Sequence, residues 1–161
     1  MLTGSLVALV TPFDGNNRVD YPSLKRLVDF HVAQGSDALV ISGTTGESPT
    51  LRRSEHIELV GRALEIAAGR IPVIAGTGSN STSQSIELSN AVADPRLAAY
   101  MAVVPYYNKP TQEGMYRHFS AIADAVDKPL LLYNVPGRTV ADMLPETIAR
   151  LARHENIFGV K

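Results

Sequence analysis

Short aliphatic runs recur about every 30 residues along the chain, and a segment with helical spacing of apolar residues follows each of the first five. A strand followed by a helix, repeated in this way, is typical of a parallel sheet with crossover helices on its faces. The sequence therefore predicts an α/β fold. The expected strands are residues 5–11, 38–42, 72–76, 100–104, 130–133 and 157–160, and the expected helices are residues 23–34, 54–68, 81–92, 112–126 and 145–153.

Two architectures fit this alternation, a doubly wound open sheet and a (β/α)8 barrel. No Gly-x-Gly-x-x-Gly motif follows the first strand, and residues 76–78 (Gly-Thr-Gly) are too short to count as one. We therefore predict a (β/α)8 TIM barrel. Because such a barrel needs about 200 residues at the least, we expect residues 1–161 to be the N-terminal portion of a single barrel catalytic domain, covering about its first six βα units.

Composition narrows the class of partner. The formal net charge is -1, so the chain lacks the field that holds nucleic acid or an anionic membrane. The absence of cysteine excludes disulfides, thiolate nucleophiles and Cys-ligated metals, and the four histidines lack paired spacing, so we expect neither a metal nor a cofactor. The start has no basic region, and its apolar stretch is too short to span a membrane. We expect a cytoplasmic protein that acts on small molecules.

Polar side chains follow several of the predicted strands at the end where barrel enzymes carry their working groups. Each has an ordinary explanation by itself: a glycine turn, a core or interface tyrosine, a solvated arginine, a lysine that points into solvent at a strand end. Together they suit Schiff-base chemistry on a small oxo acid, in which an amine attacks a ketone and hydroxyl groups move protons. The residues are Thr44, Thr45, Tyr106, Tyr107, Tyr133, Arg138 and Lys161.

Lys161 is the candidate nucleophile. A free lysine has a pKa near 10.4, so only about one amine in 10³ is unprotonated at neutral pH. Residues 157–160 read as a strand buried on both faces. We expect burial at the tip of this strand to favour the neutral amine.

Four spaced motifs resemble those of the 4-hydroxy-tetrahydrodipicolinate (dihydrodipicolinate) synthases, a family of class I Schiff-base aldolases related to N-acetylneuraminate lyase. The resemblance extends over the whole chain, and it implies a (β/α)8 barrel that condenses pyruvate with L-aspartate 4-semialdehyde in lysine (diaminopimelate) biosynthesis. It also implies a cytoplasmic homotetramer built from two dimers. The motifs are residues 43–47, 104–108, 133–139 and 159–161.

The resemblance assigns roles to individual residues. Lys161 matches the lysine that forms the imine with pyruvate. Tyr133, Thr44 and Tyr107 match a proton relay in which Tyr107 reaches the neighbouring subunit's site. Thr45 matches the loop that binds the pyruvate carboxylate, and Arg138 matches the arginine that binds the carboxylate of the aldehyde substrate. Gly137 stands where many relatives have serine.

The resemblance also implies a regulatory pocket that binds lysine in some relatives. Arg53 and Gln84 stand where lysine-sensitive relatives have histidine and glutamate. Arg53 adds a positive charge and Gln84 replaces a carboxylate by an amide. Both differences reduce the attraction for a cationic amino acid, so we expect lysine inhibition to be weak or absent. The matching positions are Ser48, Arg53, His56, Asn80, Gln84 and Tyr106.

Two alternatives to a synthase remain open on the sequence alone. A sialic acid or 2-keto-3-deoxy sugar-acid lyase would use the same imine but would not need Arg138, because its sugar tail lacks a second carboxylate. The second alternative is that residues 1–161 alone are a non-catalytic portion of such an enzyme, since two barrel units are missing, and we expect the isolated piece to be inactive.

Overall fold

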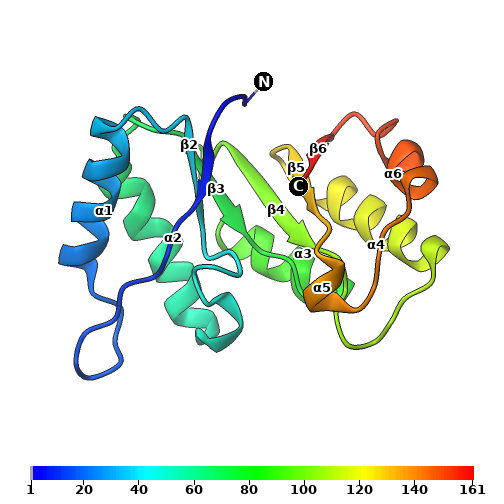
Figure 1. Ribbon diagram of the computed structural model, residues 1–161, viewed down its shortest axis with the longest axis horizontal. Helices are drawn as coiled ribbons and strands as arrows, with labels where there is room; N and C mark the ends of the chain where they lie inside the picture. Colours follow the sequence, from blue (N-terminus) through cyan, green and yellow to red (C-terminus); the bar gives the residue numbers. More distant parts are fainter. Residues whose placement is uncertain (1) are drawn as a thin grey trace. The chain divides into compact units, whose positions relative to one another are not determined.

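The computed structural model describes residues 2–161, which fall into two compact units. The first unit runs to Gly76 and includes Val92–Ala98, and the second comprises Thr77–Ala91 and Ala99–Lys161. Each unit alternates strands and helices (Figure 1). The elements are β1 (Leu6–Ala8), α1 (Tyr21–Ala33), β2 (Ala38–Ile41), η1 (Ser48–Thr50), α2 (Arg53–Ala67), β3 (Val73–Gly76), α3 (Thr82–Ala91), β4 (Ala99–Val103), α4 (Gln112–Ala125), β5 (Leu130–Tyr133), α5 (Pro136–Thr139), α6 (Pro145–Leu151) and β6 (Ile157–Val160).

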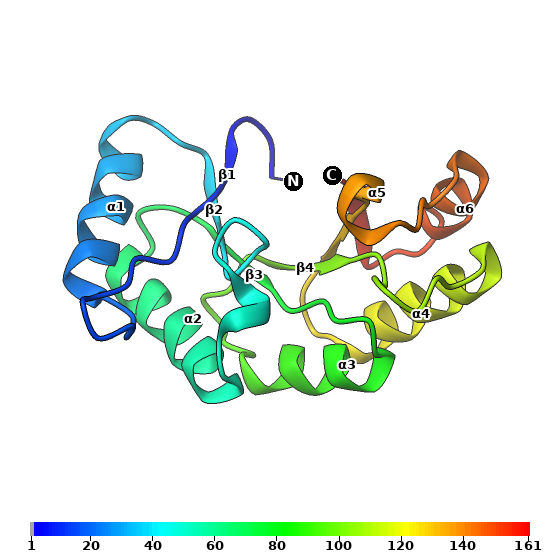
Figure 2. The same ribbon diagram turned by 60° about the horizontal axis from the view of Figure 1, so that its bottom comes forward.

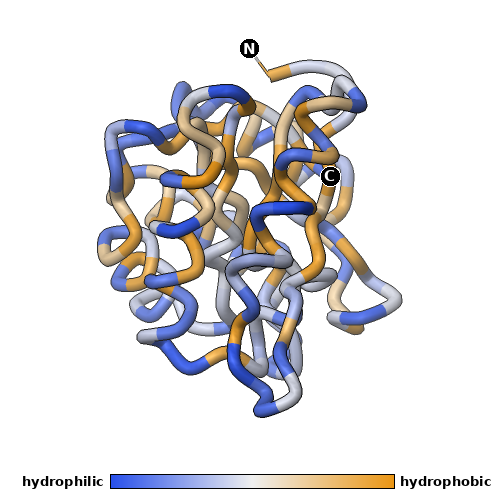
Figure 3. Tube along the Cα trace, turned by 90° about the vertical axis from the view of Figure 1, so that its left-hand side faces the viewer, coloured by the Kyte–Doolittle hydropathy of each residue, from blue (hydrophilic) through white to orange (hydrophobic). Residues whose placement is uncertain are grey.

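The sheet of the first unit consists of β1, β2 and β3. β2 lies between the other two and pairs in parallel with both, with Leu39 opposite Val73 on one side and Val7 opposite Leu39 on the other. All four residues of β2 are aliphatic and buried, because its main-chain groups are paired on both sides and α2 packs against it. Buried hydrophobic residues lie along β2 and β3, and Figure 3 colours the hydrophobic positions of the chain orange.

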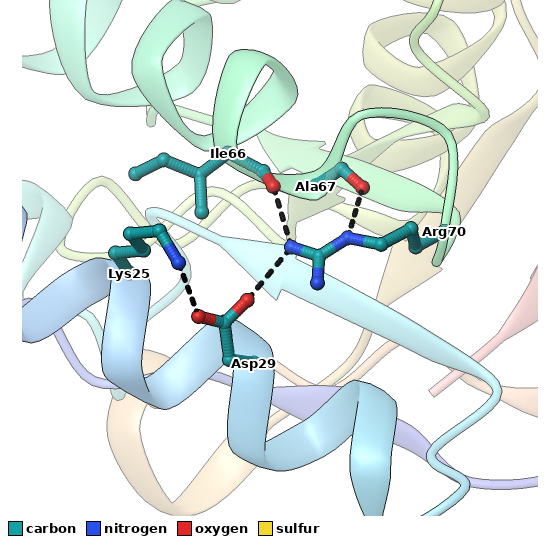
Figure 4. A network of polar contacts seen from close by, with 5 residues as sticks. All are labelled: Lys25, Asp29, Ile66, Ala67 and Arg70. Atoms are coloured by element: carbon teal, nitrogen blue, oxygen red, sulfur yellow. Dashed lines mark hydrogen bonds and ion pairs between the residues drawn. The ribbon is translucent and has the colours of Figure 1, made fainter.

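Arg70 ties the two helices of the first unit together (Figure 4). Its guanidinium donates hydrogen bonds to the carbonyls of Ile66 and Ala67 at the end of α2, at 2.8 and 3.2 Å. It also forms an ion pair of 2.8 Å with Asp29 of α1, and Lys25 contacts the other oxygen of that carboxylate. The guanidinium of Arg70 thus satisfies carbonyls at the C-terminal end of α2, and the Asp29 carboxylate on α1 holds this guanidinium in place.

The second unit has a sheet of β4, β5 and β6. β5 pairs in parallel with both neighbours, and α4 packs beside α6 (Figure 2). Thr111 caps α4 by accepting a hydrogen bond of 3.1 Å from the backbone N–H of Gly114. The β5–β6 register shifts after the pair Leu130–Ile157, so that Phe158 is an extra residue on β6.

The predicted strands and helices are all present, with ends that differ by no more than three residues. Two expectations about the last units were wrong. The predicted helices do not include residues 134–139, but Pro136–Thr139 form the short helix α5, because proline fixes a helical φ at its first turn. β6 was expected to be buried on both faces, but only Ile157 is buried, because β6 pairs with a strand on one side alone within the described residues.

Candidate active site

The loop after β2 holds Thr44 and Thr45 in a tight turn. The backbone N–H groups of Gly46 and Ser48 both donate to the carbonyl of Gly43, at 3.1 and 3.3 Å. Thr44 is half-buried and Thr45 is exposed, and within residues 2–161 neither threonine hydroxyl has a hydrogen-bond partner. Both hydroxyls are therefore available to another molecule.

Close backbone packing fixes this turn. A Cβ atom on Gly76, at the end of β3, would lie 2.5 Å from the carbonyl oxygen of Ser42, so only glycine allows β3 to pass the loop at this distance. The hydroxyl of Thr11, which follows β1, donates to the Gly46 carbonyl at 2.7 Å. The first and third strands thus hold the turn from both sides.

Lys161 and Tyr133 come together at the ends of β6 and β5. The Nζ of Lys161 lies 4.5 Å from the centroid of the Tyr133 ring, a cation–π distance. The main chain holds this arrangement, because Lys161 donates to the Leu132 carbonyl at 2.8 Å and its own carbonyl accepts from Asn134 at 2.9 Å. Since one extra residue reverses the alternation of side chains along a strand, the bulge at Phe158 decides to which face Lys161 projects.

The burial expected for Lys161 is not found: the residue is exposed. The physical reason is the same as for β6, which pairs only with β5 among the described residues. What the structure does provide is the adjacency of the amine and a tyrosine, whose ring is half-buried and whose hydroxyl has no partner within residues 2–161.

Arg138 lies in α5, shortly after β5. Its side chain is exposed and makes neither a hydrogen bond nor an ion pair with any residue of the described chain. The helix around it is well fixed, since Thr139 is buried and its hydroxyl bonds the carbonyls of Val135 and Ala141, at 3.1 and 2.8 Å. A free guanidinium on a fixed helix is suited to binding a carboxylate through two parallel hydrogen bonds.

Asn134 and Gln112 fix the segment that contains α5, and the sequence analysis gave neither a role. The side chain of Asn134 bonds Asp142 and Met143, and that of Gln112 bonds Asp142, Leu144 and Thr147. An asparagine directly after a strand is a signal for such a bridge, because its amide often bonds nearby backbone. No comparable local pattern marks Gln112, whose partners lie 30 or more residues away.

Tyr107 stands out after β4. It is 89% exposed and its φ is +73°, a left-handed conformation that is uncommon for residues other than glycine. The following residue supports it: Asn108 donates its backbone N–H to the Tyr106 carbonyl at 2.9 Å and its side-chain amide to the Asn80 carbonyl at 3.1 Å. The turn therefore holds a tyrosine away from its own unit.

The six residues of the candidate regulatory pocket are divided between the units. Ser48 begins η1, and Arg53 and His56 lie in α2, all in the first unit. His56 is buried, its Nε2 lies 2.8 Å from the Gly76 carbonyl, and burial lowers its pKa. The second unit holds the others, Asn80, Gln84 and Tyr106.

Within residues 2–161 no three His, Asp or Glu side chains are grouped in a way that would hold a metal ion. Across the same residues, none of the helices combines the length and the apolar character needed to cross a bilayer.

Comparison with known proteins decides the family. The model of the dihydrodipicolinate synthetase family matches residues 1–161. The chain belongs to the dihydrodipicolinate synthetase family. Among relatives, it is 58% identical over 161 residues to the 4-hydroxy-tetrahydrodipicolinate synthase of Aromatoleum aromaticum. That match covers 100% of this chain and 55% of the relative, so the chain spans about half the length of the curated relatives it matches.

Solved structures of this family share the fold. The dihydrodipicolinate synthase of Acinetobacter baumannii, crystallised with pyruvate, is 50% identical with a TM-score of 0.97, covering 100% of this chain and 55% of that one. The enzyme of Cyanidioschyzon merolae, crystallised with lysine, is 45% identical with a TM-score of 0.95, covering 99% of this chain and 55% of that one. The predicted fold class is confirmed: an α/β fold that matches the first part of the family's barrel.

Proposed function

We propose that this chain is the N-terminal portion of a 4-hydroxy-tetrahydrodipicolinate synthase, a lyase with one (β/α)8 barrel domain and no cofactor. It condenses pyruvate with L-aspartate 4-semialdehyde in lysine biosynthesis. One observation carries the proposal: the amine of Lys161 lies 4.5 Å from the ring of Tyr133 at the ends of two paired strands, in a chain whose relatives bear this name.

The chemistry assigns Lys161 as nucleophile. Its neutral amine attacks the ketone carbon of pyruvate, and the ketone oxygen leaves as water to give an imine. Loss of a proton from the methyl carbon gives an enamine, and that carbon then forms a bond with the aldehyde carbon of the second substrate. The hydroxyls of Tyr133, Thr44 and Tyr107 carry the protons that these steps take up and release. The absence of hydrogen-bond partners for these hydroxyls within residues 2–161 supports this role.

Two groups bind the carboxylates. The Thr45 hydroxyl and the backbone N–H groups of Thr44 and Thr45 bind the carboxylate of pyruvate, which a relative binds in its crystal. Arg138 binds the carboxylate of aspartate 4-semialdehyde. The exposed guanidinium without a partner supports this second assignment.

The active form is a homotetramer of two dimers in the cytoplasm. Tyr107 supports the assembly, because a tyrosine that is 89% exposed and held in a left-handed conformation is placed to enter a neighbouring subunit. Residues 1–161 alone are inactive, because Lys161 is exposed there and a catalytic lysine needs burial or a neighbouring charge to become a nucleophile.

Lysine inhibits this enzyme weakly or not at all. Gln84 offers an amide where sensitive relatives offer a carboxylate, and Arg53 brings positive charge to the pocket. The Nε2 of His56 already lies within hydrogen-bonding distance of the Gly76 carbonyl, at 2.8 Å. Calorimetry on the complete polypeptide should detect no lysine binding at micromolar concentrations, and a micromolar Kd would overturn this part of the proposal.

Turnover assays on the complete polypeptide test the proposal. Lys161→Ala should lower kcat by at least about 10³-fold and Tyr133→Phe by about 10²-fold, because one removes the nucleophile and the other a proton carrier. Arg138→Leu should raise the KM for the aldehyde. A sugar-acid lyase would become the better assignment if the wild-type protein did not turn over aspartate 4-semialdehyde and Arg138→Leu barely changed its turnover of a sugar acid.

A further inference from the structure

Arg138 lies in the segment 134–144. The side chains of Asn134 and Gln112 form hydrogen bonds that fix the C-terminal end of this segment. Asn134 follows the last residue of β5, and its backbone N–H donates to the Lys161 carbonyl at 2.9 Å. Its main chain is therefore fixed relative to the strand that ends in Lys161. Any segment that the Asn134 side chain binds is therefore fixed in position relative to Lys161.

The side chain of Asn134 spans the ends of the segment. Its Nδ2 donates to Oδ1 of Asp142 at 2.8 Å and to the Met143 carbonyl at 3.3 Å, while its Oδ1 accepts from the Met143 N–H at 3.1 Å. Both halves of the amide are thus used. Arg138 lies within the stretch that these bonds close.

Gln112 fixes the far end of the segment onto α4. Its Nε2 donates to the Asp142 carbonyl at 2.7 Å. Its Oε1 accepts from the Leu144 N–H at 3.0 Å and from the Thr147 hydroxyl at 2.6 Å. Five of the six bonds made by these two amides reach the Asp142–Leu144 stretch, and the sixth reaches α6.

We propose that Asn134 and Gln112 are positioning residues that set the place of Arg138 relative to Lys161 and thereby select a second substrate that carries a carboxylate. The inference rests on the proposed function. Arg138 has no partner of its own within residues 2–161, so its position depends on the backbone that carries it. Bidentate binding of a carboxylate tolerates little displacement, and a shift of about 1 Å can lower the rate by about 10².

The decisive variant is Asn134→Asp in the complete polypeptide. It keeps the acceptor for Met143 but removes the donor and brings a carboxylate against Asp142. We expect the KM for the aldehyde to rise at least about tenfold, while the KM for pyruvate and borohydride trapping of pyruvate on Lys161 stay within about twofold. In the double variant with Asp142→Asn, the amide at position 142 donates to the carboxylate at position 134. This restored pair should bring the KM for the aldehyde most of the way back to the wild-type value.

Three further variants make the result specific. Asp142→Asn alone keeps an acceptor oxygen and should be nearly silent. Asn90→Asp makes the same chemical change at an exposed position of α3 and should leave both KM values unchanged. Gln112→Glu keeps the acceptor for Leu144 and Thr147 but loses the donor to Asp142, and it should raise the aldehyde KM even if Asn134→Asp fails to fold.

An unchanged aldehyde KM in Gln112→Glu or in folded Asn134→Asp would overturn the inference, as would an equal loss for both substrates and for trapping. Failure of the wild-type protein to trap pyruvate would instead overturn the proposed function, so the two outcomes are distinct.

Discussion

The loops after β2 and after β5 are fixed in different ways. The turn at Gly43–Gly46 is held by close backbone packing, because Gly76 lies where any Cβ would strike the Ser42 carbonyl at 2.5 Å. The segment after β5 is held by the side-chain amides of Asn134 and Gln112. The first loop presents hydroxyls on rigid main chain, whereas the second presents a cation on a segment whose position depends on side chains. Substitutions should therefore damage the two loops by different routes.

Gly76→Ala tests the dependence of the first loop on glycine and should have the largest effect. The new methyl group meets backbone atoms that cannot move without separating β2 from β3, so the free energy of unfolding should fall by about 3 kcal/mol. Urea unfolding of the complete polypeptide measures this. Gly137→Ala in α5 is the matched control, since its Cβ would meet no atom within 4 Å. Equal effects of the two substitutions would contradict the comparison.

The buried histidines extend the comparison to pH. His118 in the second unit has an unpartnered Nε2 among the described residues, and burial lowers its pKa to about 4. His56 in the first unit shifts in the same direction, but its bond to the Gly76 carbonyl opposes the effect of burial. In both cases the unfolded state binds more protons, so stability is lost as pH falls below the unfolded pKa of about 6.5.

For His118 the loss should reach about 2 kcal/mol between pH 7 and pH 5. Urea unfolding at the two pH values measures it. His118→Gln removes the titrating ring and should remove this part of the pH dependence, leaving that of His56, whereas His31→Gln at a half-buried position of α1 should leave the whole dependence in place. A dependence that survives His118→Gln at full size would contradict the assignment.

Substitution of Val140, in the segment after β5, should have the smallest effect on stability. Its φ is +57°, unusual for a β-branched residue, and its side chain is 73% exposed, so substitution loses little packing. Val140→Asn should raise the free energy of unfolding by up to about 1 kcal/mol, because asparagine tolerates the left-handed region. Val10→Asn makes the same substitution at an exposed position that is not among the residues of positive φ, and it should bring no gain. A loss of stability in Val140→Asn would show that the exposed valine makes a contact in the complete protein.

The sequence predicts the first loop better than the second. Glycines, threonines and the runs before them are local signals, and they placed the strands and the turn at Thr44 correctly. The bulge at Phe158 leaves no clear local signal, because it depends on how β6 pairs with β5. The bonds of Gln112 join positions at least 30 residues apart, which periodicity and spacing do not reveal.

The exposure of Lys161 shows the same limit. The aliphatic run of β6 indicates a buried strand. The burial of Lys161, which follows β6, depends on what pairs with the edge of β6 that faces away from β5. The adjacency of Lys161 and Tyr133 was predictable, because both end neighbouring parallel strands.

The most direct test is reduction with borohydride in the presence of pyruvate, followed by intact-mass and peptide mass spectrometry of the complete polypeptide. One reduced pyruvyl group per chain should appear, on the peptide that contains Lys161, and Lys161→Ala should abolish it. An adduct on Lys25, Lys109 or Lys128 instead, or no adduct at all, would contradict the assignment of Lys161 as the Schiff-base nucleophile.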